Sequence, residues 1–453
     1  MRDIIVIGLV LLGVVASLRY PWVGIMQWTW LSLMNPHRYT YGLAYSAPLA
    51  ALTVVAILIG LLVTKDKTSP FKGAPVTLLA LLMAWITVSL LFGIDPTSDY
   101  EQWKKVMKID VLILVGLALL HSKKHIMALA WTATLSLALL GVKGGLFTLL
   151  GGGGSRVWGP PGSFIEDNNE FALALIMTIP LLRFLQLQVK NKKGKLLLMG
   201  AIVLCAAAAL GSYSRGALLA VSAMGAVMWW RGKNKLGVGM VMAMAVIPLV
   251  VLMPDEWTAR MNTIQEYDDD ASALGRFSAW WNAWNLAFHY PSGVGFNAAR
   301  PELFAKYSPY PEIGTPAAHS IYFQMLGNHG FIGLFIFLSF CIVTFQWAGW
   351  LRKHGAARPE TMWCSDLGTM CQVSLVGYAV GGAFLSLAYF DLPYNIMVLV
   401  VLARVWMTSK AWEREPVEPY TWRSIPGMWA HLPESSIPVA PKGKRRPRAQ
   451  VKV

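Results

Sequence analysis

Three basic residues have side chains suited to chemistry on a phosphorylated substrate. Arg215 lies in SYSRGALLA between two long apolar runs, Arg276 follows Gly275 at the start of an aromatic-rich segment, and His319 lies in TPAAHSIYFQMLGNHG. Arginine presents a planar fork that fits phosphate oxygens. A neutral imidazole accepts a proton, and nearby arginines disfavour its charged form. These residue types predict a site that binds phosphate and activates a hydroxyl group.

Each of the three residues also has a structural explanation. Arg215 could extend from a helix end to lipid headgroups, and Arg276 could be an exposed charge on an amphipathic helix. A lone histidine such as His319 is more often a hydrogen-bonded packing residue than a catalyst. We expect His289 and His329 to be packing residues of this kind.

Further candidate ligands lie near these residues in the sequence or on the same predicted side of the membrane. The predicted substrate-binding residues are Arg156, Lys104, Lys105, Lys108, Tyr213 and Ser214. The three lysines group along one side of a predicted helix, where they would contact anionic lipid or simply extend to the headgroups. Arg156 follows four glycines, but the lysine and hydroxyl of a P-loop are absent, which favours a flexible loop entering the membrane.

An acidic run, YDDDAS at 267–272, raises the question of a metal. Asp268 and Asp270 have the spacing of the metal-binding pair in many nucleotide-sugar transferases. Aspartates also cap helices and complement the positive end of the helix dipole. Hard cations need several oxygen ligands, and no second carboxylate cluster is evident. We therefore predict that the run is structural and that the protein uses no metal and no cofactor.

The composition indicates the elements that must position these residues. The chain has 453 residues, of which 55% are hydrophobic and only 14% are charged, whereas soluble domains contain about a quarter charged residues. Apolar runs long enough to cross a ~30 Å hydrocarbon core recur throughout. The predicted fold class is therefore an all-α polytopic membrane protein with about twelve transmembrane helices. The net charge of +15 forms no basic face with interleaved aromatics, so nucleic acid is not an expected partner.

The predicted spans alternate with loops of opposite character. They cover residues 4–34, 43–63, 73–92, 102–120, 124–150, 169–189, 195–211, 214–231, 235–253, 329–351, 364–388 and 394–410. Proline should break the first span at Arg19-Tyr20-Pro21, leaving a single crossing and a hairpin both open. Alternate loops are rich in Lys and Arg, and the positive-inside rule places them and the C-terminus in the cytoplasm. Arg215, Arg276 and His319 then share the outer side.

Four regions follow from this topology. Residues 1–253 hold nine spans, 254–318 form a large outer loop, 319–410 hold three spans, and 411–453 are a basic tail that we expect to be disordered. Within the loop, LGRFSAWWNAWNLAFHY predicts a helix with Arg276, Trp280 and Ala283 on one face. The density of aromatic residues is typical of a helix at headgroup level.

Four stretches occur in the order of known signature blocks: SYSRGALLA, GRFSAWWNAW, HYPSGVGFN and AAHSIYFQMLGNHGFIGL. In this respect the chain resembles the O-antigen ligase and polymerase superfamily over roughly residues 150–335. The stretch SLRYPWVGIMQWTWLSLMNPHRYTYG resembles a subgroup of O-glycosylation ligases. One departure is Ser320, where many relatives have asparagine after the histidine.

The resemblance implies a glycosyltransferase-C-like fold and a transferase at the periplasmic face of the bacterial inner membrane. Its donor would be a glycan on undecaprenyl pyrophosphate, and its acceptor a sugar hydroxyl of lipid A–core. By motif, the functional positions are Arg215, Arg276 and His319. The implied reaction is metal-independent and inverting, with the arginines on the pyrophosphate and the histidine as base.

Other functions compatible with the same residues differ mainly in the acceptor. An O-antigen polymerase or a protein O-oligosaccharyltransferase would use the same blocks. A transporter of lipid-linked glycans predicts charged residues near span midplanes and broken helices in both halves. Here the strongest polar residues cluster at the predicted outer ends of the spans, which favours an enzyme.

Overall fold

The fold is known from a computed structural model, which describes residues 2–231, 236, 239–240, 251, 253–262 and 271–415. These residues belong to one compact unit, Met1–Glu418. Every regular element among them is a helix, in agreement with the predicted all-α class. Most of the predicted span 235–253, the aspartates at 268–270 and the tail from residue 416 lie outside the described residues.

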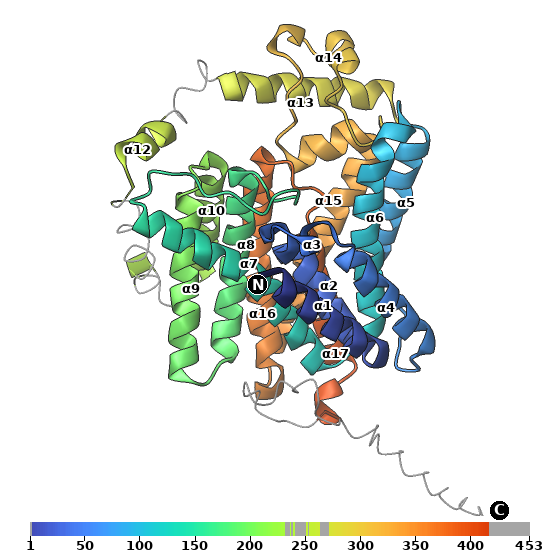
Figure 1. Ribbon diagram of the computed structural model, residues 1–453, viewed down its shortest axis with the longest axis vertical. Helices are drawn as coiled ribbons and strands as arrows, with labels where there is room; N and C mark the ends of the chain where they lie inside the picture. The colour runs from blue at the N-terminus through green and yellow to red at the C-terminus, as the bar shows by residue number, and fades with distance from the viewer. Residues whose placement is uncertain are drawn as a thin grey trace, which may run out of the picture. The chain divides into compact units, whose positions relative to one another are not determined.

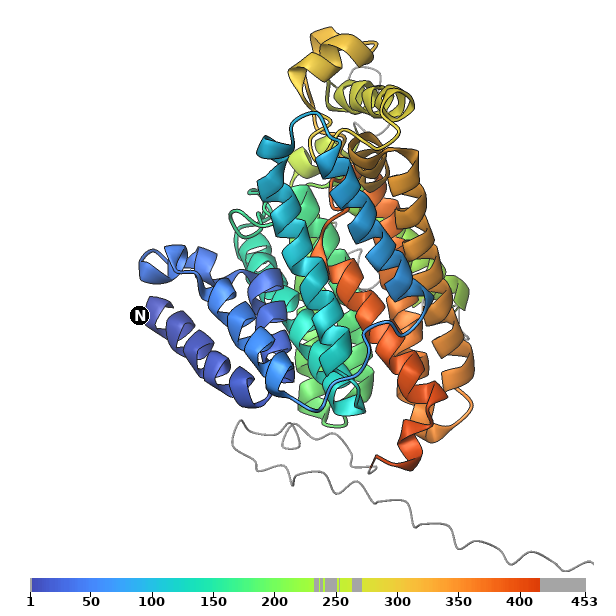
Figure 2. The ribbon, with the colours of Figure 1, turned by 90° about the vertical axis from the view of Figure 1, so that its right-hand side faces the viewer.

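The long helices pack side by side into a bundle (Figures 1 and 2). They are α1 (Arg2–Arg19), α2 (Pro21–Met34), α4 (Leu49–Val63), α5 (Ala74–Leu91), α6 (Pro96–Leu119), α7 (Lys123–Leu150), α8 (Asn168–Gln188), α9 (Lys192–Leu210), α10 (Arg215–Arg231), α15 (Ile321–Gly355), α16 (Met362–Gly381) and α17 (Asp391–Thr408). Shorter helices are α3 (Leu43–Ser46), α12 (Asp255–Asn262), α13 (Ala271–His289) and α14 (Pro301–Tyr307). Short 3-10 turns, including η5 (Gly382–Phe384), join some of them.

Seven helical segments within the described residues are long and apolar enough to cross a membrane. They are Ala74–Leu91, Lys123–Leu150, Asn168–Gln188, Lys192–Leu210, Ile321–Gly355, Pro359–Phe384 and Asp391–Thr408. This supports a multi-pass membrane protein. The full set of about twelve transmembrane helices stays a prediction.

The first predicted span, 4–34, is two helices rather than one. α1 ends at Arg19 and α2 begins at Pro21, the break that the proline predicts. The two helices form a hairpin, because Gln27 Nε2 donates a hydrogen bond 3.0 Å long to the Val10 carbonyl. A Cβ added to Gly24 would lie 2.8 Å from Ser17 Oγ, so the helices also meet near the turn. The single-crossing alternative for 4–34 was therefore wrong.

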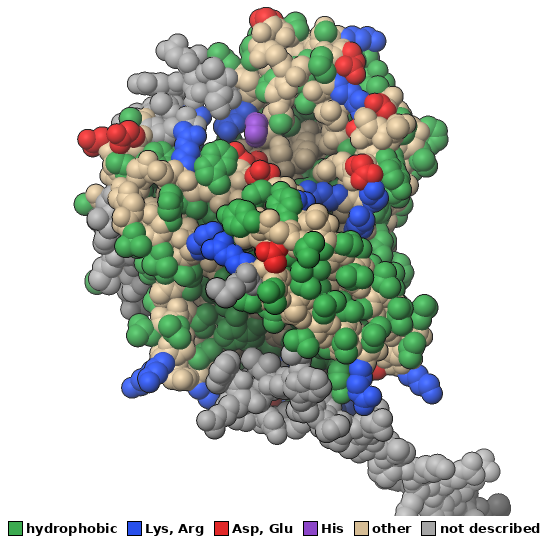
Figure 3. Space-filling model, viewed as in Figure 1, with side chains coloured by type: hydrophobic (Ala, Val, Ile, Leu, Met, Phe, Trp, Pro, Cys, Tyr) green, Lys and Arg blue, Asp and Glu red, His purple; other side chains and the backbone are tan. Residues whose placement is uncertain are grey.

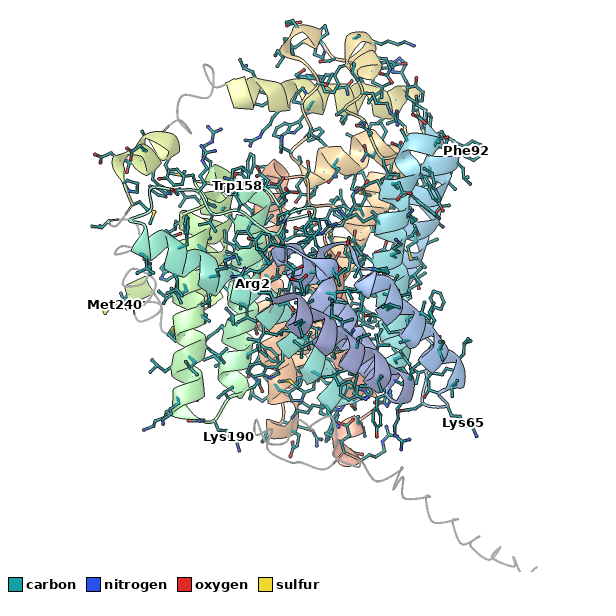
Figure 4. All side chains as sticks on the ribbon, in the orientation of Figure 1. Arg2, Lys65, Phe92, Trp158, Lys190 and Met240 are labelled. Atoms are coloured by element: carbon teal, nitrogen blue, oxygen red, sulfur yellow. The ribbon has the colours of Figure 1, made fainter. Side chains whose placement is uncertain are left out.

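The helix α13 lies across one end of the bundle, which we call the α13 end (Figures 1 and 2). Phe92, at the end of α5, lies toward this end, whereas Lys65 and Lys190 lie at the opposite end (Figure 4). Lys65 and Lys190 belong to two of the loops predicted to be cytoplasmic. The fold thus places these two lysine-rich loops at the same end of the bundle, away from α13.

The predicted span 329–351 begins earlier, at Ile321, because two helical pieces are joined at a kink. Gly330 is the kink, with a φ of 68° that glycine adopts without strain. The segment after α13 packs into this kink, since the N–H groups of Val294 and Gly295 donate to the Asn328 carbonyl. His329 is fully buried there and shares a 2.6 Å hydrogen bond with the Tyr389 hydroxyl. This is the arrangement expected of a packing histidine.

A buried ion pair fixes the loop that follows α13. Arg300 Nη2 donates to Asp99 Oδ1 on α6 at 2.8 Å, and Asp99 Oδ2 accepts from the Phe296 N–H at 2.8 Å. Only 4% of Asp99 is exposed. Because both partners are buried, separating them would leave a charge without compensation. The loop is therefore held rigidly on the α13 end.

Candidate active site

The SYSR stretch forms the predicted tight turn, between α9 and α10. Tyr213 has a φ of 61°, a backbone angle that residues other than glycine rarely adopt. Asn168 Nδ2, at the start of α8, donates to the Ser212 carbonyl at 2.5 Å. Ser214 Oγ accepts from the Ala217 N–H at 3.2 Å and caps α10. This turn places Arg215, which is half-buried, at the first position of α10.

The glycine-rich loop after α7 supports this turn. The Tyr213 hydroxyl donates to the Gly153 carbonyl at 2.8 Å, and Gly153 has a φ of 76° that suits glycine. The Arg156 guanidinium lies 5.9 Å from the centre of the Tyr213 ring. The structure thus brings Arg156 to the turn that carries Arg215. From the other side, Trp257 of α12 donates to the Leu210 carbonyl at 2.9 Å.

The helix α13 confirms the predicted two-faced aromatic helix. Ala283 is buried, whereas Trp281 is 52% exposed on the other side. Trp280 holds the helix over the start of α15: its Nε1 donates to the Ala318 carbonyl at 2.7 Å. Its ring stacks on Phe323 with centroids 4.9 Å apart. Arg276 lies one turn before Trp280 on the same side of α13, which directs it toward the segment that carries His319.

His319 occupies a strained position directly before α15. Its φ is 41°, in the left-handed region, where histidine is found more often than most side chains. The next residue, Ser320, is buried and its Oγ accepts from the Phe323 N–H at 3.5 Å, capping α15. Burial, and then the charge of Arg276, lower the pKa of His319, while Asp167 opposes them. The imidazole is therefore neutral at neutral pH, as a general base must be.

Asp167, which sequence reasoning missed, is close enough to this histidine to raise its pKa. It caps α8, and its Oδ1 accepts from the Asn169 N–H at 2.8 Å. Burial raises the pKa of Asp167, but hydrogen bonds with Glu170 and Asn169 and the nearby His319 hold it below its usual value. Glu170 is only 8% exposed. The sequence did carry a signal, since EDNNE at 166–170 places acidic and amide residues at the start of a long apolar helix.

A cavity of about 150 Å³ lies beneath α13, against the segment that directly precedes His319. Its polar lining includes Asn282, Asn297, Gln324, Asn328 and Ser386, and its wall includes Pro316, Ala317 and Ala318. Figure 3 shows that this face of the molecule is hollowed below α13, with a histidine and basic and acidic side chains at the edge of the hollow. The cavity offers neutral hydrogen-bonding groups and is bordered by the segment that directly precedes His319.

The segments that build this site also carry the match to known proteins. Residues 200–338 match the family model described as O-Antigen ligase. Residues 200–338 belong to the O-antigen ligase family. Residues 1–190 match a second model, described as a family of unknown function (DUF5935). No curated protein matches the chain.

Both the O-antigen ligase region and the region that matches the second model contribute residues to the candidate site. Arg215, Arg276 and His319 lie within 200–338, whereas Arg156 and Asp167 lie within 1–190. Arg276 and Asp167 act in opposite directions on the pKa of His319, which Arg276 lowers and Asp167 raises. The SYSR turn is tied to the start of α8 through Asn168, the neighbour of Asp167. The site is thus assembled from both regions.

The three predicted substrate-binding lysines of α6 occupy different environments. Lys105 Nζ lies 3.9 Å from the centre of the Phe164 ring in the loop before α8. Lys104 pairs with Glu101, and Lys108 is exposed. Lys105 therefore faces the loop that leads to Asp167.

Tyr213 and Ser214 are buried, and their hydroxyl groups hold the SYSR turn. They shape the position of Arg215. Their predicted contact with substrate, like the substrate contacts of the lysines, stays a prediction.

Proposed function

We propose that the protein transfers a glycan from undecaprenyl pyrophosphate to a sugar hydroxyl of lipid A–core. Membership of the O-antigen ligase family supports glycosyl transfer of the ligase or polymerase type. The observation that carries the proposal is the half-buried His319, whose pKa is lowered by burial and by Arg276. It directly follows a segment, 316–318, that lines a cavity with several amide side chains. A neutral base, a fixed cation and room for a sugar are the parts that such a transfer needs.

In the proposed reaction the acceptor hydroxyl oxygen attacks the anomeric carbon of the donor glycan. The bond from this carbon to the pyrophosphate oxygen breaks, and undecaprenyl pyrophosphate leaves with the electron pair. His319 takes the proton of the acceptor hydroxyl, because a free hydroxyl is a weak nucleophile. Attack opposite the leaving group inverts the anomeric centre.

Arg215 and Arg276 are proposed to bind the pyrophosphate. Negative charge on its bridging oxygen grows as the bond breaks, and cations fixed in advance stabilise that charge strongly where water is excluded. Arginine suits this role because its planar fork forms paired hydrogen bonds with phosphate oxygens. Arg156, which lies over the Tyr213 ring, is positioned to extend the basic surface toward the donor.

The proposed orientation places the α13 end in the periplasm and the C-terminus in the cytoplasm, within the inner membrane. It is supported by the position of Lys65 and Lys190 at the opposite end (Figure 4) and by the positive-inside rule. In this orientation a lipid-linked donor and lipid A–core approach the site from the same leaflet.

The test of this function is a transfer assay with purified protein. Undecaprenyl-pyrophosphate glycan is supplied with lipid A–core, with no added acceptor, or with an unfolded acceptor protein, each in the presence of EDTA. Glycosylated lipid A–core is the expected product, formed with EDTA present. Elongated donor glycan would show that the protein is a polymerase, and glycosylated protein would show that it is an oligosaccharyltransferase. Transport of the lipid-linked donor without any glycan transfer would refute the proposed enzymatic function.

A further inference from the structure

The cavity beneath α13 has one lining side chain, Gln324 of α15, with an amide group that the protein itself uses only in part. We infer that the cavity holds the sugar ring that carries the acceptor hydroxyl, and that Gln324 Nε2 donates a hydrogen bond to an oxygen of this ring. Gln324 is then a specificity-determining residue for the acceptor. This inference rests on the proposed function and names the part of the acceptor that the cavity takes.

The size and lining of the cavity fit an uncharged sugar. Its volume is about 150 Å³, whereas a single water molecule needs only about 10–15 Å³. Every lining side chain is uncharged, since alanine, phenylalanine and proline alternate with amide groups and one serine. A phosphate or carboxylate would lose its hydration here and gain no counter-charge. A largely apolar wall with a few hydrogen-bonding groups is typical of a pocket for a neutral ligand.

Two of the lining amides hold the wall of the cavity. Asn328 Oδ1 accepts from the Ala298 N–H at 3.0 Å, and its Nδ2 donates to the Phe296 carbonyl at 3.1 Å. Asn282 Nδ2, from α13, donates to the Ala298 carbonyl at 3.0 Å. These bonds join α13, α15 and the loop between them around the cavity. The cavity is therefore formed by the fold itself, before any ligand binds.

Gln324 differs from these two amides. Its Oε1 accepts from the Ala388 N–H at 3.1 Å. Because a backbone N–H can only donate, this bond fixes which end of the amide is the oxygen. Nε2 forms no hydrogen bond with the residues that the structure describes, and it remains accessible. A donor whose other end is already held binds a sugar oxygen at little cost in ordering.

The position of Gln324 favours the acceptor over the donor as the occupant. Gln324 lies in the first turn of α15, where its N–H donates to the Ser320 carbonyl at 2.8 Å. Residues 316–318, which lead directly to His319, form another part of the lining. In the proposed reaction the acceptor hydroxyl must reach His319, whereas the donor carries a pyrophosphate that needs cations. An uncharged cavity next in sequence to the base suits the acceptor.

Two substitutions separate the free donor from the structural bond. Gln324→Glu keeps an oxygen for the Ala388 N–H and, when charged, has no donor, whereas Gln324→Met removes both groups. At pH 8 an accessible glutamate is charged. Gln346→Met is the matched control, because Gln346 is an exposed residue of the same helix. Initial rates of transfer are measured at pH 8, first with lipid A–core varied at saturating donor, then with the donor varied.

Both Gln324 variants should raise the KM for lipid A–core about 10-fold, the effect of one lost hydrogen bond. The KM for the donor should stay within about 2-fold, and Gln346→Met should match the unaltered protein in both constants. Loss in Gln324→Met alone would overturn the inference, because the Ala388 bond would then account for it. A rise in the KM for the donor would also overturn it, because the cavity would then hold the donor sugar.

Binding is tested separately from transfer, with no donor present. Asn297 is exposed and lines the cavity, whereas Glu312 is exposed and lies outside the lining. Modification of Asn297→Cys and Glu312→Cys by a maleimide is followed by mass spectrometry of the full-length protein, with lipid A–core, with lipid A alone, or with neither. Lipid A–core should protect the cysteine at 297 and leave the one at 312 reactive.

The outcomes of the labelling distinguish the cavity from the reaction. Equal protection by lipid A alone, or no protection at 297, would overturn the inference, and transfer by the unaltered protein would leave the proposed function standing. Protection at 297 by lipid A–core without any transfer by the unaltered protein would support the sugar site and refute the proposed function.

Discussion

Trp280 connects the aromatic helix to the proposed base, and its replacement tests that connection in detail. Trp280→Phe removes the 2.7 Å hydrogen bond from Nε1 to the Ala318 carbonyl, the residue directly before His319. The ring stack on Phe323, with planes 8° apart, is largely preserved. The substitution therefore loosens the position of Arg276 and His319 without removing the hydrophobic contact.

The expected fall in transfer activity follows from the hydrogen bond that is lost. Its net contribution is about 1 kcal/mol, and an unsatisfied carbonyl adds up to about 1–3 kcal/mol. Each 1.36 kcal/mol changes a rate by a factor of about 10. We therefore expect kcat/KM for glycan transfer to fall roughly 10- to 100-fold, because small displacements of reacting groups are costly. The assay is initial-rate transfer at fixed donor concentration.

Trp281→Phe is the matched control, since it is the same substitution on the next residue. Trp281 is 52% exposed on the other side of α13, so its replacement should leave kcat/KM within about 2-fold of the original, a difference of under 0.5 kcal/mol. Equal losses in the two variants would refute the reasoning, because the effect would then be a general response of α13 to the loss of an indole.

Three further results are expected. Gly293→Ala should lower the thermal midpoint of unfolding far more than Gly314→Ala. Both glycines have positive φ, but a Cβ added to Gly293 would lie 2.2 Å from a carbonyl oxygen of α15, whereas a Cβ added to Gly314 would meet nothing within 4 Å. Arg300→Ala should destabilise the detergent-solubilised protein by about 3–5 kcal/mol, since it leaves a buried carboxylate unpaired; a loss below 1 kcal/mol would contradict the buried ion pair. Arg276→Gln removes a charge that lowers the pKa of His319, so the acidic limb of the pH profile for transfer should move to higher pH. A shift to lower pH would contradict the effect of Arg276 on His319.

Local features of the fold were predictable because they depend on neighbouring residues. Proline at position 21 marks the break between α1 and α2, and the short polar stretch before Arg215 marks the turn between α9 and α10. The spacing of aromatic residues in 271–289 indicates a two-faced helix. In each of these cases the backbone constraint or the periodicity lies within a few residues.

The assembly of the site was not predictable in the same way. Membrane helices are apolar on nearly every side, so their pattern shows where they lie in the sequence and not which helices they contact. The electrostatic effect of Asp167 on the pKa of His319 joins segments far apart in the chain. The contact between Asn168 and the Ser212 carbonyl is equally non-local. The acidic start of α8 could have been singled out from the sequence, but its partner could not.

The central claim is that His319 is the base of the transfer, and one substitution tests it most directly. Asparagine tolerates the left-handed backbone that His319 adopts, so His319→Asn preserves the chain path and removes the base. His289→Asn is the control, because His289 is exposed and shares a hydrogen bond with the Asn285 carbonyl of its own helix.

Transfer to lipid A–core and binding of the undecaprenyl-pyrophosphate donor are measured in both variants. The account predicts that His319→Asn abolishes transfer while donor binding stays close to that of the unaltered protein, and that His289→Asn behaves like the unaltered protein. Full transfer by His319→Asn would contradict the account.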